Sequence, residues 1–259
     1  MGALITFSSD YGPTDEFVGV CHLVIARLAP DVRVLDVVHG IRGVRAGSVV
    51  LAQSLIDAPE GAVHLAVVDP GVGTTRRAVA IACGNGSVLV GPDNGLFFPV
   101  AELLGGPVAA YELTQTWFMR DNLSSTFHGR DIFAPAAAHL ALGTSPHDLG
   151  PTVDVASLVR LPPPHVEVAA GRLEADVLRT DWFGNLQLAA MGDQLTESGL
   201  RGKVAVNGRP ATVGGKFADV EPGGLLVYVN SADHVAVAAN GAEANRLLDR
   251  PSKVTIEGP

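Results

Sequence analysis

Cysteine, aromatic residues and excess positive charge are all scarce in this sequence. The two cysteines, Cys21 and Cys83, each lie inside an apolar segment, so we expect two buried thiols and no disulfide scaffold. No pair of histidines has the spacing of metal ligands, and we predict no metal. The net charge of −9 over 259 residues argues against a nucleic-acid-binding protein, because such proteins are usually basic.

Long hydrophobic runs and a secretory leader are also missing. No apolar run approaches the roughly 20 residues of a membrane-spanning helix. The strand-like segment that begins at Ala3 follows no basic, leader-like stretch. We therefore expect a soluble, cytoplasmic protein with no membrane partner. Since 47% of the residues are hydrophobic, the chain can bury a sizeable core.

Strand-like and helix-like segments alternate through the first part of the chain. Short continuous apolar runs, such as 62–68, are typical of strands buried on both faces, and segments with helical spacing lie between them. Residues 1–160 are therefore predicted to form an α/β domain with a mostly parallel sheet between helices.

The pattern of apolar residues changes after the Pro-rich segment 161–165, which we interpret as a stiff linker. Residues 166–259 consist of short β-rich runs broken by Gly-rich turns, with one convincing helix at about 241–248. This pattern predicts a small all-β barrel as a second domain.

Asp10, Asp69 and Asp93 each follow a predicted strand, at the edge where α/β sheets bind ligands. One aspartate at a strand end is ordinary turn chemistry, but three that converge on one edge would suit a cation or ribose hydroxyls. After Asp69 the chain turns through Pro70-Gly71-Val72-Gly73 and delivers Arg76. This loop has neither the phosphate-loop pattern nor a following helix, so we exclude nucleotide-triphosphate and dinucleotide readings.

Two further stretches carry candidate chemistry. His128 ends a long polar loop before a helix, where a proton-transfer role is plausible, and Asp131 is predicted as the N-cap of that helix. In the second domain, Asp181 to Asn185 combines a carboxylate, aromatic rings and an amide around a turn. A structural turn and a ligand-binding loop are equally good interpretations of that segment.

Taken together, these motifs resemble one family in order along nearly the whole chain. The resemblance rests on Ser9-Asp10-Tyr11-Gly12, on Asp69-Pro70-Gly71-Val72-Gly73-Thr74 with Arg76, on Gly91-Pro92-Asp93-Asn94-Gly95, on Thr126-Phe127-His128-Gly129-Arg130-Asp131, on Asp181-Trp182-Phe183-Gly184-Asn185 and on Asn230-Ser231. The chain resembles the S-adenosyl-L-methionine hydroxide adenosyltransferases, hydrolase relatives of the fluorinase and chlorinase. The resemblance implies a homotrimer with sites at subunit interfaces, no cofactor, and hydrolysis of S-adenosyl-L-methionine to adenosine and L-methionine.

The resemblance also implies roles for individual residues. Asp69, Arg76 and His128 match a catalytic triad that handles the attacking water. The implied substrate contacts are Asp10 on the ribose, Asp15 and Phe17 along the methionine end, Asp181 near its amine, Asn185, Phe217 and Asn240 around adenine, and Ser231 on the methionine carboxylate.

Some positions depart from the halogenating relatives. Those enzymes have tyrosine where this chain has Asp69, and the fluorinase has serine where this chain has Gly129. Ala232 replaces an arginine that helps to bind the methionine carboxylate in the fluorinase. A 5′-halo-adenosine synthase, a non-catalytic adenosine or S-adenosylmethionine binding protein, and a hydrolase of another nucleoside are the alternatives.

Overall fold

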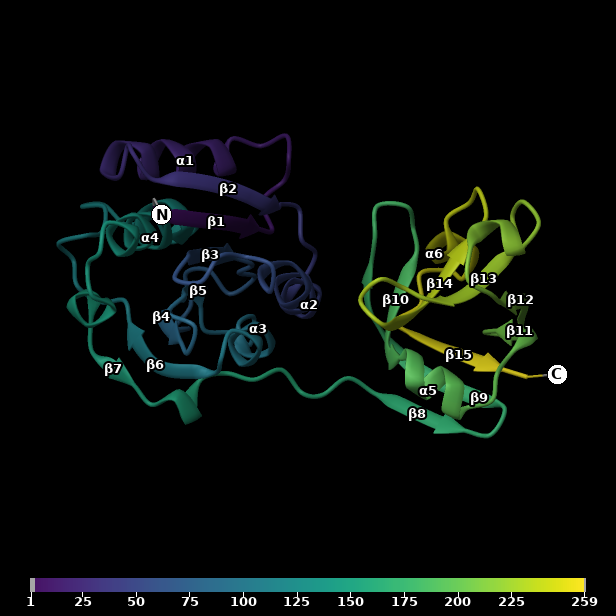
Figure 1. Ribbon diagram of the computed structural model, residues 1–259. Helices are drawn as coiled ribbons and strands as arrows, with labels where there is room; N and C mark the ends of the chain where they lie inside the picture. Colours follow the sequence, from purple (N-terminus) through teal and green to yellow (C-terminus); the bar gives the residue numbers. More distant parts are fainter. Residues whose placement is uncertain (1–2, 259) are drawn as a thin grey trace. The chain divides into compact units, whose positions relative to one another are not determined.

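A seven-stranded sheet forms the centre of the first part of the chain (Figure 1). The computed structural model describes residues 3–258, so the first two residues and the last one of the expected domains lie outside it. Its helices and strands are β1 (Leu4–Ser9), α1 (Phe17–Leu28), β2 (Arg33–Val38), α2 (Val44–Leu55), β3 (Val63–Val67), β4 (Ala78–Cys83), β5 (Val88–Pro92), α3 (Phe98–Leu103), β6 (Pro107–Glu112), the π-turn η1 (Gly129–Phe133), α4 (Ala134–Ala141), η2 (Pro146–Leu149), β7 (Thr152–Val153) and η3 (Val155–Ser157).

The strand order is β2-β1-β3-β5-β4-β6-β7. β2, β1, β3 and β5 pair in parallel, whereas β4 is antiparallel to both β5 and β6. β6 therefore runs in the same direction as the first four strands, and only β4 and β7 oppose them. The expected α/β domain with a mostly parallel sheet is confirmed.

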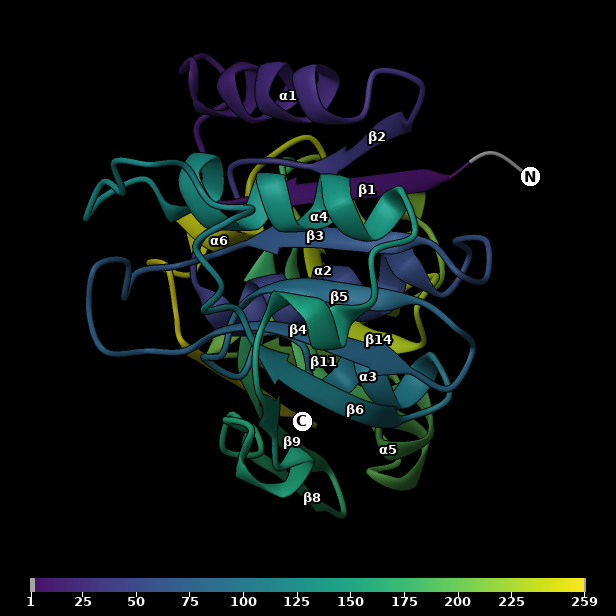
Figure 2. The ribbon, with the colours of Figure 1, turned by 90° about the vertical axis from the view of Figure 1, so that its left-hand side faces the viewer.

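Helices cover both faces of this sheet and bury two separate apolar clusters. α1 and α4 lie on one face, where Phe7 and Phe133 are fully buried. α2 and α3 lie on the other, around Leu51 and Val100 (Figure 2). Such two-sided burial explains why the central strands are continuous apolar runs.

Parallel pairing brings the carboxyl ends of β1 and β3 to the same edge. Ser9 is level with Val67 in the register, and the Asp10 amide donates a hydrogen bond to the Val67 carbonyl at 3.0 Å. The loops that follow these strands, and that carry Asp10 and Asp69, are therefore neighbours.

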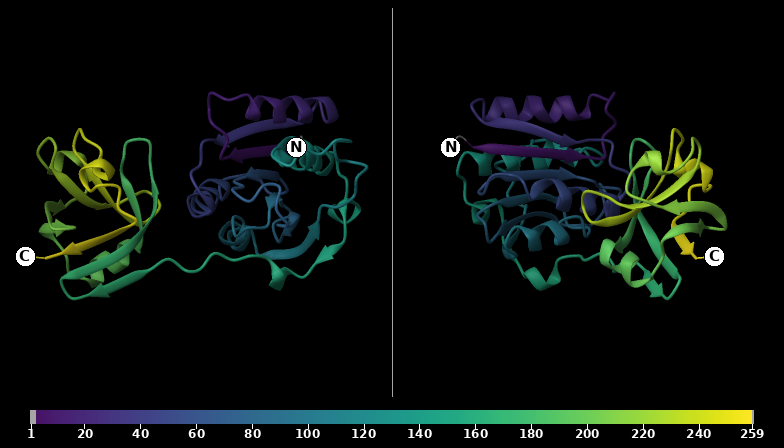
Figure 3. Two further views of the ribbon diagram at one scale, coloured as in Figure 1. Left: turned by 180° about the vertical axis from the view of Figure 1, so that it is seen from behind. Right: turned by 45° about the vertical axis from the view of Figure 1, so that its right-hand side comes forward.

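The boundary between two compact units lies between Leu161 and Pro162, within the Pro-rich segment, which has no helix or strand (Figure 3). The second unit contains β8 (Val166–Ala169), β9 (Arg172–Thr180), β10 (Leu186–Met191), α5 (Gly192–Glu197), β11 (Gly202–Val206), β12 (Arg209–Val213), the 3-10 turn η4 (Phe217–Asp219), β13 (Leu225–Val229), β14 (His234–Ala239), α6 (Ala244–Leu247) and β15 (Lys253–Glu257).

The second unit is a closed barrel, as expected. Its strands follow the order β10-β14-β13-β12-β11-β15-β9, and pairing of β9 with β10 closes the ring, with β8 added beside β9. The expectation of one convincing helix was wrong, because α5 is also present and α6 is shorter than 241–248. α5 starts at a glycine, and its first turn is fixed by the Gln194 side chain, which accepts the Met191 amide at 2.9 Å.

No helix within residues 3–258 is long and apolar enough to cross a membrane. The thiols of Cys21 and Cys83 are buried and form no disulfide, as expected, and the Cys83 thiol donates to the Ile81 carbonyl. Burial raises their pKa values to about 12 and about 11, so both remain protonated near neutral pH.

Candidate active site

Asp69 and Arg76 lie at the two ends of the loop that joins β3 to β4, and their side chains form a buried ion pair. Arg76 Nε donates to both Asp69 carboxylate oxygens at 3.0 Å, and Arg76 Nη2 contacts Asp69 Oδ2. Only 10% of the Arg76 side chain and 4% of the Asp69 side chain are exposed. The guanidinium also lies 5.2 Å from the centre of the Phe133 ring. Its position is therefore set from several sides by a charge-assisted fork and an aromatic face.

His128 joins this pair from a distant part of the sequence. Arg76 Nη2 lies 2.8 Å from His128 Nδ1. Because a guanidinium can only donate, Nδ1 is the acceptor and the neutral ring carries its proton on Nε2. Burial and then the Arg76 charge hold the pKa of His128 below its ordinary value of 6.5. The imidazole is accordingly neutral near pH 7, with an N–H available at Nε2.

The loop that carries His128 is held by Asp131. Asp131 is fully buried, and it accepts the Ser124 amide at 2.7 Å and Arg130 Nε at 2.6 Å. Burial opposes the charged form, but these hydrogen bonds keep the pKa of Asp131 below its ordinary value. The N-cap prediction for Asp131 was wrong. The residue lies inside the π-turn, because its carboxylate binds the preceding loop and not the first turn of a helix.

Asp10 lies beside the triad at the same sheet edge. Its Oδ2 accepts the Asp69 amide at 2.9 Å, which links the ends of β1 and β3. Burial raises the pKa of Asp10, backbone hydrogen bonds oppose this, and the nearby Asp69 charge raises it further. The two carboxylates therefore occupy one polar corner with Arg76.

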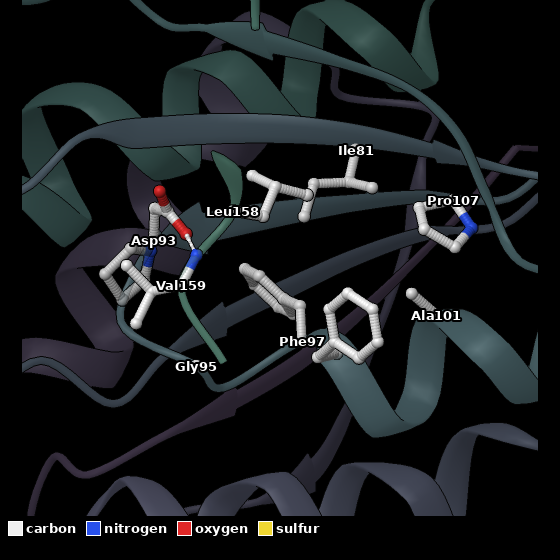
Figure 4. Close-up of a pocket in the computed structure, with 10 residues that line it drawn as sticks. Ile81, Asp93, Gly95, Phe97, Ala101, Pro107, Leu158 and Val159 are labelled. Atoms are coloured by element: carbon white, nitrogen blue, oxygen red, sulfur yellow. Dashed lines mark hydrogen bonds between the residues drawn. The ribbon is translucent and has the colours of Figure 1, made fainter. Parts of the chain in front are cut away.

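Asp93 follows β5, which is parallel to β3, so Asp10, Asp69 and Asp93 lie at one edge of the sheet as expected. The Asp93 carboxylate nevertheless binds partners of its own. Its carboxylate binds Arg77 Nε at 2.8 Å and the Val159 amide at 2.9 Å. Arg77 therefore has partners separate from those of Arg76, although the two residues are adjacent in the loop before β4. The cavity beside Asp93 and Val159 holds about 10 Å³, no more than one water (Figure 4).

The two other residues expected near the substrate in the first unit differ in their surroundings. Asp15 is exposed, and its carboxylate lies over the Cα of Gly12. The Phe17 ring is half-buried, 5.5 Å from the Tyr11 ring and 5.0 Å from the Phe127 ring. Phe17 thus belongs to an aromatic cluster that supports the loop before His128.

The second unit contains a hollow of about 740 Å³ beside the Asp181–Asn185 turn. Asn185 and Phe217, both expected at adenine, line it. The residues that sequence reasoning did not assign are Trp182, Phe183, Ala239, Gly241, Ala242, Glu243, Arg246 and Leu247. Trp182 is 94% exposed and Phe183 is 73% exposed. For Trp182 and Phe183, the signal in the sequence is two adjacent aromatic residues within a polar turn.

Asp181 and Asn240 support the loops around the hollow. Asp181 Oδ1 accepts the amides of Phe183 and Asn185, and its Oδ2 accepts the Asn185 side-chain amide at 2.8 Å. The Asn240 side chain donates to the Val220 carbonyl at 2.8 Å. Both side chains are occupied with the protein itself, so they position neighbours such as Asn185.

Ser231 lies elsewhere on the second unit, exposed in the turn between β13 and β14. The turn is organised by Asn230, whose side-chain oxygen accepts the amides of Ala232 and His234. The Ala232 amide is thus occupied inside the turn.

One group of possible metal ligands occurs within residues 3–258, formed by His165, Glu167 and Glu174. Lys253 and Arg172 bind Glu174, and these bonds lower its pKa to about 2 despite the opposing desolvation. The Glu174 carboxylate is already matched by two cations, and the group is unrelated to the triad.

Gly73 tests how closely the two triad loops must approach. Its φ is +78°, and a Cβ would overlap the Ser125 carbonyl oxygen. We expect Gly73→Ala to destabilise the protein by roughly 1–2 kcal/mol in urea unfolding, because it adds both strain and a clash. Hydrogen exchange of residues 124–128 should also rise.

Gly71→Ala is the matched control in the same loop. A Cβ at Gly71 would meet its nearest atom, Thr74 Oγ1, at an ordinary 3.5 Å. Equal stability of the two variants would contradict the close approach of the loops.

Comparison with known proteins gives a consistent relationship over most of the chain. The model of the SAM hydroxide adenosyltransferase N-terminal domain matches residues 5–150, and that of the C-terminal domain matches residues 175–256. A protein named (R)-S-adenosyl-L-methionine hydrolase from Salinispora arenicola is 54% identical, over 94% of this chain and 93% of its own length. A fluorinase from Actinopolyspora mzabensis is 29% identical over 92% of this chain and 91% of its own.

The fold of a solved structure agrees with this relationship. An uncharacterized conserved protein from Thermotoga maritima superimposes with a TM-score of 0.86 at 33% identity, covering 98% of this chain and all of that one. From its sequence motifs, its two matched domains and its fold, this chain belongs to the SAM hydroxide adenosyltransferase family.

Proposed function

We propose that the protein hydrolyses S-adenosyl-L-methionine to adenosine and L-methionine, by in-line attack of a water on C5′. The observation that carries the proposal is the buried contact of Asp69, Arg76 and His128, which offers a carboxylate and two N–H donors together. The name of the 54% identical relative specifies the (R) form, and we propose the same sulfonium stereoisomer as the preferred substrate here.

The C5′ carbon of the substrate needs little activation by the protein. The leaving group is a neutral thioether released from a sulfonium, so the site must mainly place and activate a water. The positive sulfonium and the developing hydroxide neutralise each other in the transition state, which a dry pocket favours. No cofactor is required in this proposal, and turnover should persist in a chelator.

The hydrogen bonds divide the roles of the triad. His128 Nδ1 already accepts from Arg76, so its Nε2–H would donate to the oxygen of the water. Arg76 would stabilise the negative charge as it develops. Asp69 is then the group that accepts the proton, because carboxylate oxygens can accept more than the bonds from Arg76.

The substrate contacts are assigned on the same basis. Asp10 would bind the ribose hydroxyls, with Asp15 and Phe17 toward the methionine end. Asn185 and Phe217 would hold adenine in the hollow of the second unit, whose aromatic residues suit a flat ring. Asp181 and Asn240 would act through the loops they hold, and Ser231 is the candidate for the methionine carboxylate.

A homotrimer is proposed as the working form, with each site shared between two copies. What supports it is the high exposure of Trp182 and Phe183 at the hollow, together with the location of the triad in the other unit. Large exposed aromatic side chains are typical of surfaces that another molecule covers.

Incubation with S-adenosylmethionine in ¹⁸O-labelled water tests the function. We expect label at the adenosine 5′-oxygen, faster turnover of the (R) form, and no 5′-halo-adenosine when chloride or fluoride is added. Asp69→Asn and Arg76→Ala should lower kcat by roughly 10²–10⁴-fold, while adenosine still binds. Tight binding of S-adenosylmethionine without methionine release would instead support a binding protein.

His128→Gln separates a donor from a base. In the wild type, activity should fall as the pH drops through the pKa of His128, which lies below 6.5, because protonation of Nδ1 removes the acceptor for Arg76. A Gln amide can still donate but does not titrate. We therefore expect this variant to keep about a tenth of the activity or more and to lose that acid limb.

The control is His139→Gln, since burial also lowers the pKa of His139 but that residue lies outside the triad. It should keep the wild-type pH profile. Complete loss of activity in His128→Gln would assign the base role to His128.

Mixing two inactive variants tests the shared site. The first variant, Arg76→Ala, has a defective triad in the first unit. The second, Asn185→Ala with Phe217→Ala, has a defective hollow in the second unit. After unfolding and refolding together, mixed trimers would contain some intact sites, so activity should return. No recovery, or a monomeric mass by light scattering, would contradict an interface site.

A further inference from the structure

Tyr11 is a polar side chain beside the triad that has received no role. It follows Asp10 directly, and its backbone is fixed on both sides. The Tyr11 amide donates to Ser9 Oγ at 3.2 Å, and its carbonyl accepts the Gly40 amide at 2.8 Å. Ser9 Oγ is in turn 2.7 Å from His39 Nδ1. The loop that presents Tyr11 is therefore held by a chain of partly buried hydrogen bonds.

The ring of Tyr11 is equally well placed. It packs 5.5 Å from the Phe17 ring and 5.7 Å, edge-on, from the Phe127 ring. Phe127 directly precedes His128, so this aromatic cluster sets Tyr11 against the loop that carries the triad histidine.

The hydroxyl of Tyr11 lies directly over Gly129. A Cβ on Gly129 would overlap Tyr11 Oη, and it would lie only 3.0 Å from Cζ. The position after His128 must therefore be a glycine if Tyr11 keeps its place. The sequence thus makes room for a phenol oxygen immediately beside the histidine.

Packing alone does not explain this oxygen, since a phenylalanine ring would fill the same cluster. Within residues 3–258 the Tyr11 hydroxyl has no hydrogen-bond partner from the protein. Tyr11 is only partly buried, so this hydroxyl is available to a molecule bound beside Gly129 and His128.

The phenol of Tyr11 stays protonated in this environment. Burial raises the pKa of Tyr11, the Cys21 thiol and the Asp10 and Asp69 carboxylates raise it further, and Arg76 opposes them. The phenol therefore keeps its proton at working pH values and can donate a hydrogen bond.

We propose that Tyr11 is a further catalytic residue, whose hydroxyl donates a hydrogen bond to the water that Arg76 and His128 hold. This role rests on the proposed hydrolysis. The phenol keeps its proton, and the proton of the water still passes to Asp69. With Arg76 and His128, Tyr11 makes a third donor around the oxygen that becomes negative in the transition state.

The test is Tyr11→Phe, which keeps the ring and removes the oxygen. We expect kcat to fall roughly 10- to 100-fold, with KM and the melting temperature close to those of the wild type. Tyr111→Phe removes a phenol from β6 and is the matched control, with unchanged kcat. Wild-type kcat in Tyr11→Phe, or a loss confined to KM, would overturn the role.

A double-mutant cycle adds a second measurement. Gly129→Ala should lower kcat by displacing the Tyr11 hydroxyl, and the same change should cost less in the Tyr11→Phe background. Equal losses in both backgrounds would overturn the contact. A wild-type protein that releases no adenosine would overturn the proposed function together with this role, whereas an active wild type with an equally active Tyr11→Phe would overturn only the role of Tyr11.

Discussion

The buried ion pair of Asp69 with Arg76 is the constraint on which the first unit's sheet edge depends. A guanidinium removed from water must have its donors matched, and Arg76 achieves this with Asp69, His128 and the Phe133 ring. These partners come from the end of β3, from the long polar loop and from the π-turn. One cation therefore holds three segments of the chain together, and the short turn between Asp69 and Arg76 is what allows it to do so.

Arg76 and Arg77, neighbours in the loop before β4, bind different partners at this edge. Arg76 lies with the α1 and α4 face, where the triad and Phe133 are found. Arg77 points to the opposite face, where it binds Asp93 and the Ser157 carbonyl. The same pair of residue types thus builds the proposed active site on one side and a structural ion pair on the other.

Sequence patterns predicted the architecture well, because buried strands and amphipathic helices leave continuous and periodic apolar signals. They did not predict the partners of polar side chains. Asp93 and Asp69 both follow strands, and each binds an arginine. Their roles differ because Asp69 binds Arg76, which also contacts His128, whereas Asp93 binds Arg77, which does not. Asp181 and Asn240 look like ligand contacts in the sequence, but their hydrogen bonds go to their own loops. Loop conformation decides such cases, and no periodicity records it.

The balance of charges at the proposed active site explains why water, and not a halide, is the expected nucleophile. Asp10 and Asp69 contribute two negative charges, while Arg76 and a bound sulfonium would contribute two positive ones, so the site with substrate is balanced. A protonated His128 would disturb that balance, consistent with its lowered pKa. A halide would add an unmatched negative charge in a low-dielectric site, which is costly. A tyrosine at the position of Asp69 would remove one negative charge, so the remaining positive charge could be matched by an anion. The Asp69 carboxylate therefore favours a neutral nucleophile.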